Sequence, residues 1–143
     1  MNDLLIQALR EYGIEETVGG QHNPNVLKYF KEIGHEWVKD DETAWCSAFV
    51  NWCAMKCGYE YTKKLNACSW LAIGEKIENP HPGDIVIFWR ASPDSWKGHV
   101  AIYINHDEDE RHINVLGGNQ SNMVNIRGYD KGRLLGYRRL NKI

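Results

Sequence analysis

One cysteine of this sequence, Cys46, stands where a nucleophile could be activated. It lies three residues after Thr43, a residue type that caps helix N-termini, and the apolar run 44–56 follows without Gly or Pro. Free backbone N–H groups and the helix dipole at such a position favour a thiolate, the reactive form of cysteine. The same N–H groups could stabilise an acyl-transfer oxyanion. Taken alone, Cys46 is more often explained as a small core residue.

His99 is the candidate base for this thiol. It opens the apolar segment 99–104, directly after a polar loop that ends at Gly98. A histidine at the start of a strand can meet the start of a helix packed on the same sheet, which is the geometry a Cys–His pair requires. Gly98 would leave room there for a substrate backbone. A lone histidine at such a position is, however, more often an ordinary surface residue.

A third polar element follows the next strand-like segment, 112–116, and consists of the residues Gly-Gly-Asn-Gln at 117–120. If 99–104 and 112–116 pair in antiparallel fashion, the end of the second segment lies beside the start of the first. Asn119 or Gln120 would then lie near His99, where an amide oxygen could fix the tautomer and the orientation of the imidazole. A glycine turn with a left-handed Asn is the alternative explanation. The ordered combination of Cys, His and amide is more specific than any of its members.

The elements that must position these residues form two halves of the chain. Helical spacing of apolar residues predicts helices first, and a turn at 80–84 is followed by short apolar runs typical of strands. Helices followed by a meander of strands predict an α+β fold with an antiparallel sheet of about five strands. We expect a single domain, 1–143, with a helical lead-in at 1–42, the cysteine helix and a following helix at 43–78, and the sheet at 84–140. The expected helices are 4–12, 25–33 (capped by Asn25), 44–56 and 69–76, and the expected strands are 85–89, 99–104, 112–116, 124–126 and 135–138.

The composition is that of an ordinary globular protein without a charge excess. Hydrophobic residues make up 43% and charged residues 25% of the 143 positions, and the formal net charge is -2. This balance gives no basic face for nucleic acid. The N-terminus has no basic segment followed by an apolar run, and no apolar run approaches the ~18 residues of a membrane span. We therefore expect no signal peptide, no membrane insertion and no nucleic-acid partner.

The four cysteines do not form a metal or disulfide pattern. They are Cys46, Cys53, Cys57 and Cys68, and they contain no Cys-x-x-Cys pair, so neither a zinc ribbon nor a thioredoxin-type motif is indicated. Two helical turns, ~10 Å, separate Cys46 from Cys53, which is too far for one ion bound from a single helix. The lack of a signal peptide argues against a disulfide framework. We expect neither a metal nor a cofactor.

Four ordered segments resemble the CHAP and NlpC-type cysteine peptidases and amidases of the papain-like superfamily. The segments are WCSAFVNW at 45–52, PGDIVIF at 82–88, GHVAIY at 98–103 and LGGNQ at 116–120. The resemblance covers roughly 43–138 and is greatest to small single-domain members found in phage endolysins and in bacterial cell-wall hydrolases or toxins. It implies a papain-like fold in which a helix that begins near its catalytic cysteine packs on the sheet.

The resemblance also implies roles for single residues. Cys46 would attack an amide carbonyl while His99 removes and later donates the proton, and Asn119 matches the third polar position of the family. Many CHAP members carry an acidic residue just before that Asn, whereas this sequence has glycines at 117 and 118. The orienting role is therefore left to Asn119, or to Gln120 if the turn is shifted. Asp84, in the shared Pro-Gly-Asp turn, is interpreted as structural.

Some CHAP endolysins bind calcium, but Asp40, Asp41 and Glu42 do not follow an EF-hand pattern, so no metal site is expected. The implied activity is hydrolysis of an amide bond of peptidoglycan, either as an N-acetylmuramoyl-L-alanine amidase or as an endopeptidase of the stem or cross-bridge. The chain is rich in Trp, and flat aromatic rings pack on sugars and peptides. The residues expected along the substrate groove are Trp45, Ser47, Trp89, Trp96 and Gly98.

Two other functions remain open from the sequence. A cysteine deamidase or transglutaminase-like toxin that acts on proteins would use the same Cys–His pair, and a non-catalytic wall-binding module would need neither residue. We expect a monomer that is made in the cytoplasm and acts at the cell wall or in the periplasm. Release through a holin pore or export by a secretion system would deliver it, and an exported effector would have an immunity protein as its partner.

Overall fold

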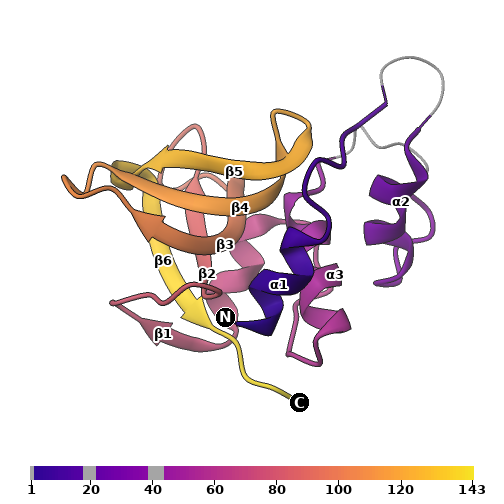
Figure 1. The fold of residues 1–143 in the computed structure, drawn as a ribbon, viewed down its shortest axis with the longest axis horizontal. Helices are drawn as coiled ribbons and strands as arrows, with labels where there is room; N and C mark the ends of the chain where they lie inside the picture. The colour runs from indigo at the N-terminus through magenta and orange to yellow at the C-terminus, as the bar shows by residue number, and fades with distance from the viewer. Residues whose placement is uncertain (1, 18–21, 39–43) are drawn as a thin grey trace.

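The computed structural model describes residues 2–17, 22–38 and 44–143 and has helices on one side of an antiparallel sheet (Figure 1). The helices come first along the chain, as expected for an α+β fold. They are α1 (Asp3–Leu9), α2 (Pro24–Lys31) and α3 (Cys46–Lys56), followed by the short 3-10 helix η1 (Ala67–Ala72). The strands are β1 (Glu75–Ile77), β2 (Ile85–Trp89), β3 (Gly98–His106), β4 (His112–Gln120), β5 (Met123–Asp130) and β6 (Leu134–Arg139), with a second 3-10 helix, η2 (Lys131–Arg133), before β6.

Polar caps set the starts of the first two helices. The side chain of Asn2 accepts hydrogen bonds from the backbone N–H groups of Leu4 and Leu5, which begins α1. Asn23 caps α2, and Pro24 occupies the first helical turn, where its fixed φ and missing N–H are tolerated. The prediction of Asn25 as this cap was therefore wrong by two residues. Helix α1 is also shorter than predicted, since it ends at Leu9.

Helix α3 lies in the centre of the molecule and packs against β3 and β4. Its residues from Cys46 to Ala54 are all buried, which explains why its apolar residues show no single face. Thr43, the predicted cap, lies outside the described residues. The helix begins at Cys46, and Trp45 occupies the cap position without a side-chain hydrogen bond to the backbone. Trp45 therefore leaves the first N–H groups of α3 without a bond from its own side chain.

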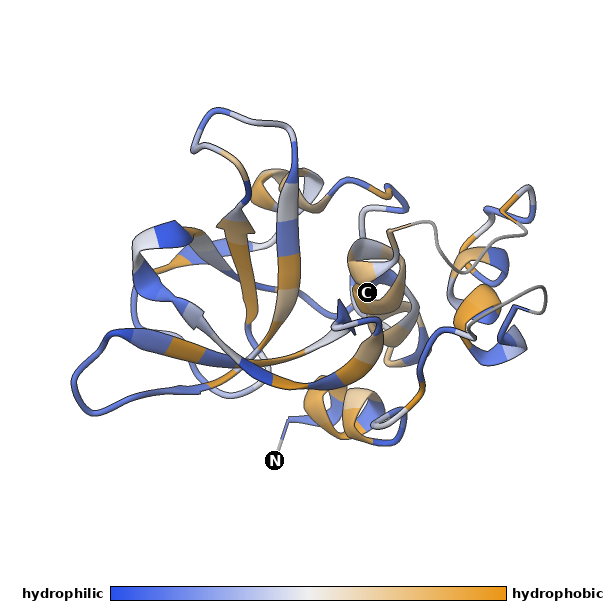
Figure 2. Ribbon diagram, turned by 90° about the horizontal axis from the view of Figure 1, so that it is seen from above, coloured by the Kyte–Doolittle hydropathy of each residue, from blue (hydrophilic) through white to orange (hydrophobic). Residues whose placement is uncertain are grey.

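The sheet has six strands in the order β1-β6-β2-β3-β4-β5, and all neighbouring pairs are antiparallel. One face, which includes Ile87 and Val100, contributes to the main core with the helices. The other face carries a second hydrophobic cluster, which includes Phe88 and Tyr103. Figure 2 shows hydrophobic residues along the strands and helices and hydrophilic residues in the hairpin loops at the edge of the molecule.

Two local predictions differ from the structure. Strand β1 was missed because two of its three residues, Glu75 and Lys76, are charged and exposed. The predicted helix 69–76 is a 3-10 helix that ends at Ala72, after which the chain turns into β1 and pairs with β6. None of the helices in the described ranges has the length and apolarity to cross a membrane.

Candidate active site

The structure brings the start of α3 beside the start of β3. Cys46 is the first residue of α3, and only 5% of it is exposed. Its thiol interacts with the backbone N–H of Val100, the residue that follows His99 on β3. Cys46 and Gly98 also line one common hollow. The two candidate catalytic residues thus lie on adjoining segments, as the order of the sequence motifs predicted.

Burial decides the protonation state of the nucleophile. Loss of solvent raises the pKa of the Cys46 thiol above its ordinary value. The backbone N–H groups of Val100, Ser47 and Cys46, together with the positive charge of Arg90, act in the opposite direction but do not outweigh burial. The N–H groups at the helix start favour the thiolate, as expected, but desolvation exceeds their effect. The resting Cys46 is a protonated thiol.

A fixed amide sets the tautomer of His99. The Nε2 atom of His99 lies 2.9 Å from Oε1 of Gln120. The Nε2 amide group of Gln120 donates to the backbone carbonyl and to Oδ1 of Asn125, at 2.8 and 3.0 Å, so the amide has one orientation. Because Oε1 can only accept, the His99 ring carries its proton on Nε2. Its Nδ1 atom is then an unprotonated nitrogen with a free lone pair.

The free nitrogen of His99 has no partner within the described residues, although it is fully buried. Burial lowers the pKa of His99 to about 4, the hydrogen bond that Nε2–H donates to Gln120 opposes this shift, and the charge of Arg90 adds to it. The imidazole is therefore neutral at physiological pH. A neutral nitrogen with a free lone pair is able to accept a proton, which is what a general base requires.

The residue that orients His99 is Gln120, and Asn119 makes no hydrogen bond to the ring among the described contacts. Strand β4 pairs Ile102 with Leu116, and an unbroken ladder would place Asn119 directly across from His99. A bulge between Gly117 and Gln120 adds one residue to β4, and Asn119 takes a φ of 59° there. The bulge moves Gln120 into the place predicted for Asn119.

The two glycines of this segment fit the close packing at the bulge. A Cβ atom on Gly117 would lie 2.6 Å from Oε1 of Gln120, and one on Gly118 would lie 2.7 Å from the Trp45 ring. Any larger residue would displace the orienting amide or the core aromatic ring. The Gly-Gly pair, which stands where many CHAP members have an acidic residue, thus leaves the space in which Gln120 can orient His99.

Tyr129 is a site residue that the sequence analysis missed. Its ring stacks on His99, with the ring centroids 4.9 Å apart, and on Phe88, with centroids 5.0 Å apart. Burial raises the pKa of Tyr129 above its ordinary value. The predicted strand 124–126 ended too early, because Arg127 and Gly128 interrupt the apolar pattern of β5. The extra length of β5 is what brings Tyr129 over the imidazole.

A hollow of about 210 Å³ opens beside Cys46. Two of the expected groove residues, Trp96 and Gly98, line it, and Trp96 is 73% exposed. The connection between β2 and β3 supplies one wall, and the segment before η1 supplies the other. The lining residues are Ala44, Cys46, Leu65, Asn66, Ala67, Arg90, Trp96, Lys97 and Gly98.

Three of the expected groove residues lie elsewhere. Trp45 is completely buried, where its ring stacks on Tyr29 and its Nε1 donates to Glu16. Ser47 is also completely buried, and its hydroxyl donates to the backbone carbonyl of Lys64 and accepts from Trp70. Both predictions were wrong because α3 is buried on all sides, so residues next to Cys46 face the core. Trp89 is half-buried under the guanidinium of Arg133 and does not line the hollow.

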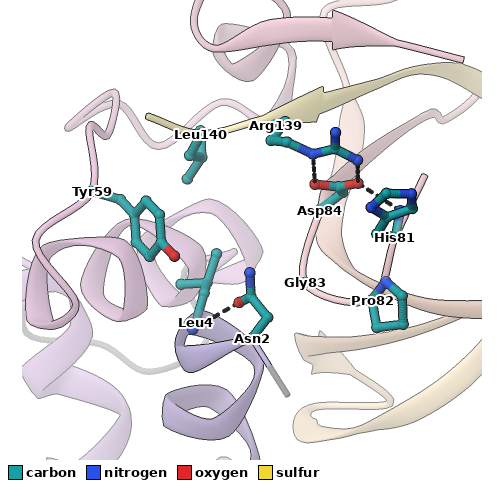
Figure 3. Close-up of a pocket in the computed structure, with 9 residues that line it drawn as sticks. All are labelled: Asn2, Leu4, Tyr59, His81, Pro82, Gly83, Asp84, Arg139 and Leu140. Atoms are coloured by element: carbon teal, nitrogen blue, oxygen red, sulfur yellow. Dashed lines mark hydrogen bonds and ion pairs between the residues drawn. The ribbon is translucent and has the colours of Figure 1, made fainter. Parts of the chain in front are cut away.

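The other end of β2 has a polar hollow of about 360 Å³, shown in Figure 3. Asp84 is clasped there by Arg139, whose Nε and Nη2 donate to its two carboxylate oxygens at 2.9 and 2.8 Å. The backbone N–H of His81 donates to the same carboxylate at 2.6 Å, and Asn2 is engaged as the cap of α1. These polar groups are paired with one another, in agreement with the structural interpretation of Asp84.

No group of three or more His, Cys, Asp or Glu side chains within the described ranges is placed to hold a metal ion. Asp40, Asp41 and Glu42, considered above for calcium, lie outside those ranges. All four cysteines are free thiols. Cys53 is buried in the core, and its pKa is raised well above the ordinary value by burial.

Comparison with known proteins agrees with this geometry. The model of the CHAP domain family matches residues 38–119, a range that includes Cys46 and His99 and ends one residue before Gln120. A protein similar to a lipoprotein of the NLP/P60 family, from Staphylococcus aureus subsp. aureus Mu50, has a similar structure with a TM-score of 0.56 and 20% sequence identity. The match covers 96% of this chain and 40% of that chain, so this chain spans less than half its length. A comparison with curated proteins finds no match. The shared architecture is the papain-like α+β fold.

Proposed function

This chain belongs to the CHAP domain family, and we propose that it hydrolyses an amide bond of peptidoglycan, with Cys46 as nucleophile and His99 as base. CHAP and NlpC/P60 proteins are, as families, cell-wall hydrolases with peptidase or amidase activity. The observation that carries the proposal is the unpaired, buried Nδ1 of His99, on a ring whose opposite nitrogen is held by Gln120. Most buried polar atoms are hydrogen-bonded, so a free basic nitrogen beside a thiol supports a role as base.

The proposed reaction starts from a neutral pair. The Nδ1 atom of His99 removes the thiol proton of Cys46 as the sulfur attacks the amide carbonyl, and the resulting imidazolium donates that proton to the leaving amine. The bond between the carbonyl carbon and nitrogen breaks, which leaves a thioester on Cys46. Water, deprotonated by His99, then releases the acid and restores the thiol. The Gln120 oxygen stabilises the imidazolium through the Nε2–H bond at 2.9 Å.

The start of α3 supplies donors for the oxyanion. The residue at the cap position, Trp45, makes no side-chain hydrogen bond to the first backbone N–H groups of the helix. The N–H groups of Cys46 and Ser47 act on the thiol sulfur itself, which places them at the reacting centre. Preorganised donors in a water-poor site stabilise a tetrahedral intermediate strongly.

The substrate proposed is the peptide part of the wall, cut as a muramoyl-alanine amidase or as a stem or cross-bridge endopeptidase. The exposed ring of Trp96 at the hollow supports contact with a sugar or peptide. The proposed site of action is the cell wall or periplasm, reached by a monomer released through a holin pore or exported by a secretion system. If it is an exported effector, an immunity protein is its proposed partner.

Digestion of purified peptidoglycan, followed by mass spectrometry of the fragments, tests this proposal. The wild type should release new muropeptides, and Cys46→Ala should release none while its melting temperature stays close to the wild-type value. Cys57→Ala is the matched control, since it removes a thiol from the residue that ends the same helix, and it should digest the wall normally. Wall digestion by Cys46→Ala would refute the mechanism. An active wild-type thiol that deamidates or cross-links proteins and leaves peptidoglycan intact would refute the substrate.

A further inference from the structure

We propose that Arg90, with Lys97 beside it, forms an anion subsite that binds a free carboxylate of the substrate next to the amide bond to be cut. The inference rests on the proposed function and assigns the class of peptide that the site accepts. Both residues line the hollow that contains Cys46. The substrate class is an acidic stem peptide, in which a carboxylate stands close to the scissile amide.

The positions of the two cations are fixed by the strands that carry the site. Arg90 follows the last residue of β2, and Lys97 precedes the first residue of β3. The backbone N–H of Arg90 donates to the carbonyl of Lys97 at 3.2 Å, which ties the two ends of the loop together. A second bond, from the N–H of Ser92 to the carbonyl of Arg90 at 2.7 Å, fixes the turn. The two residues therefore lie at the base of the β2–β3 loop, and Lys97 is separated from His99 only by Gly98.

The described residues that line the hollow carry one sign of charge. Arg90 and Lys97 are its charged residues, and the remaining lining residues, apart from Cys46 itself, are uncharged. Among the described residues no carboxylate lines the hollow, although the chain as a whole has a net charge of -2. A cleft lined by one sign of charge attracts the opposite charge.

Arg90 lies close enough to the catalytic groups to act on them electrostatically. Its positive charge contributes to lowering the pKa of Cys46, of His99 and of Tyr129, so one guanidinium reaches all three side chains. Because Arg90 and Cys46 also line the same hollow, an anion bound to Arg90 would lie on the side of the nucleophile that faces this hollow.

The Arg90 guanidinium is not used by the fold. Within the described residues it has no ion pair, no side-chain hydrogen bond and no aromatic ring under it, and Lys97 has only the Trp96 ring, 5.9 Å from its Nζ. By contrast, Arg139 is bound to Asp84, Arg138 to the carbonyl of Leu71, and Arg133 lies over Trp89. An arginine left unpaired beside a nucleophile is suited to bidentate binding of a carboxylate.

A pair of muramoyl stem peptides that differ only in one group tests this inference. In one peptide the glutamyl residue carries its free carboxyl group, and in the other this group is amidated. The wild type should cleave the free acid with a kcat/KM on the order of tenfold above that of the amide, mainly through KM, since a charge-assisted hydrogen bond contributes on this scale. Arg90→Gln should lose this preference, so that the ratio of kcat/KM for the acid to kcat/KM for the amide falls to about one. Lys97→Gln should reduce it partly.

Arg111→Gln is the matched control, because it removes an arginine that is 79% exposed on the β3–β4 hairpin, and it should keep the preference. Binding of both peptides to Cys46→Ala by calorimetry gives a readout independent of turnover, and the acid should bind more tightly than the amide. Equal cleavage of both peptides by the wild type, or an unchanged preference in Arg90→Gln, would overturn the anion subsite and leave the proposed function standing. A wild type that cleaves neither peptide and no purified wall would overturn both.

Discussion

The two ends of β2 carry polar groups of opposite character. Before the strand, Asp84 is paired with Arg139 and with the turn at His81, so each charge has its partner. After the strand, His99 keeps a buried nitrogen free and Arg90 has no partner among the described residues. Both ends border hollows of a few hundred Å³. At one end of β2 the polar groups stabilise the fold by pairing, and at the other end His99 and Arg90 keep groups that a substrate could use.

Replacing the base should separate activity from stability most strongly. His99→Asn removes the free nitrogen and should lower kcat/KM for wall digestion about 1000-fold, in the range of general-base catalysis. Its melting temperature should fall only modestly, since the free nitrogen makes no hydrogen bond and the losses are the bond to Gln120 and the stacking on Tyr129. Turbidity loss of cell walls and thermal unfolding are the two measurements. A cooperative loss of both would mean that this end of β2 is structural after all.

The buried imidazole should also make stability depend on pH. The folded pKa of His99 is about 4, below the ordinary 6.5, so between these values the unfolded chain binds a proton that the folded chain does not. Stability is therefore fully present above pH 6.5 and should fall by about 3 kcal/mol as the pH is lowered to 4. Urea unfolding of wild type and His99→Asn at pH 7 and pH 4.5 isolates this effect from the other histidines. Parallel losses in both proteins would contradict it.

At the other end, Asp84→Asn should lower stability and leave the chemistry intact. It breaks the bidentate pair with Arg139, and because Arg139 is 39% exposed the expected loss is about 2 kcal/mol, less than for a fully buried pair. The specific activity of the folded fraction should be unchanged. Asp109→Asn, at an exposed loop pair with Arg111, is the matched control and should change stability by less than about 0.5 kcal/mol. A loss of kcat in folded Asp84→Asn would show that Asp84 also contributes to catalysis and would contradict its purely structural role.

The orienting amide should give the smallest effect. Gln120→Leu removes the acceptor for His99 and should reduce kcat on the order of tenfold with little change in KM, because the ring loses its fixed tautomer. Gln120→Glu keeps an acceptor, so it should restore much of kcat and move the acid limb of the pH–rate profile upward by favouring the imidazolium. Asn119→Gly keeps the left-handed backbone and should behave as wild type. A larger effect at Asn119 than at Gln120 would reverse the assignment.

Local patterns of the sequence predicted much of the fold and part of the site. The five apolar residues of β2 predicted that strand with its observed bounds, and the order of Cys46 and His99 predicted which elements meet. The choice between Asn119 and Gln120 depends on a bulge formed by long-range packing of the two glycines at 117 and 118 against Ala101 and Trp45, which no local pattern contains.

The sequence could not predict the burial of Trp45 and Ser47, because this burial also depends on residues that are distant along the chain. Trp45 faces Tyr29, a residue of a different helix, and Ser47 faces the carbonyl of Lys64 beyond the end of α3. The stacking of Tyr129 on His99 joins β5 to β3 across β4. Side-chain chemistry and spacing indicated the nucleophile and the base. The contacts that orient these residues arise from tertiary packing between strands and helices that are distant in the sequence.

A direct observation of the His99 ring by nitrogen-15 NMR tests the central claim best, namely that a neutral imidazole is held with its Nδ1 free. The account predicts a proton on Nε2, an unprotonated Nδ1 at neutral pH, and titration at a pKa of about 4. Gln120→Leu should lose the fixed tautomer in the same spectrum. A ring protonated on both nitrogens at neutral pH, or one whose single proton resides on Nδ1, would contradict the account.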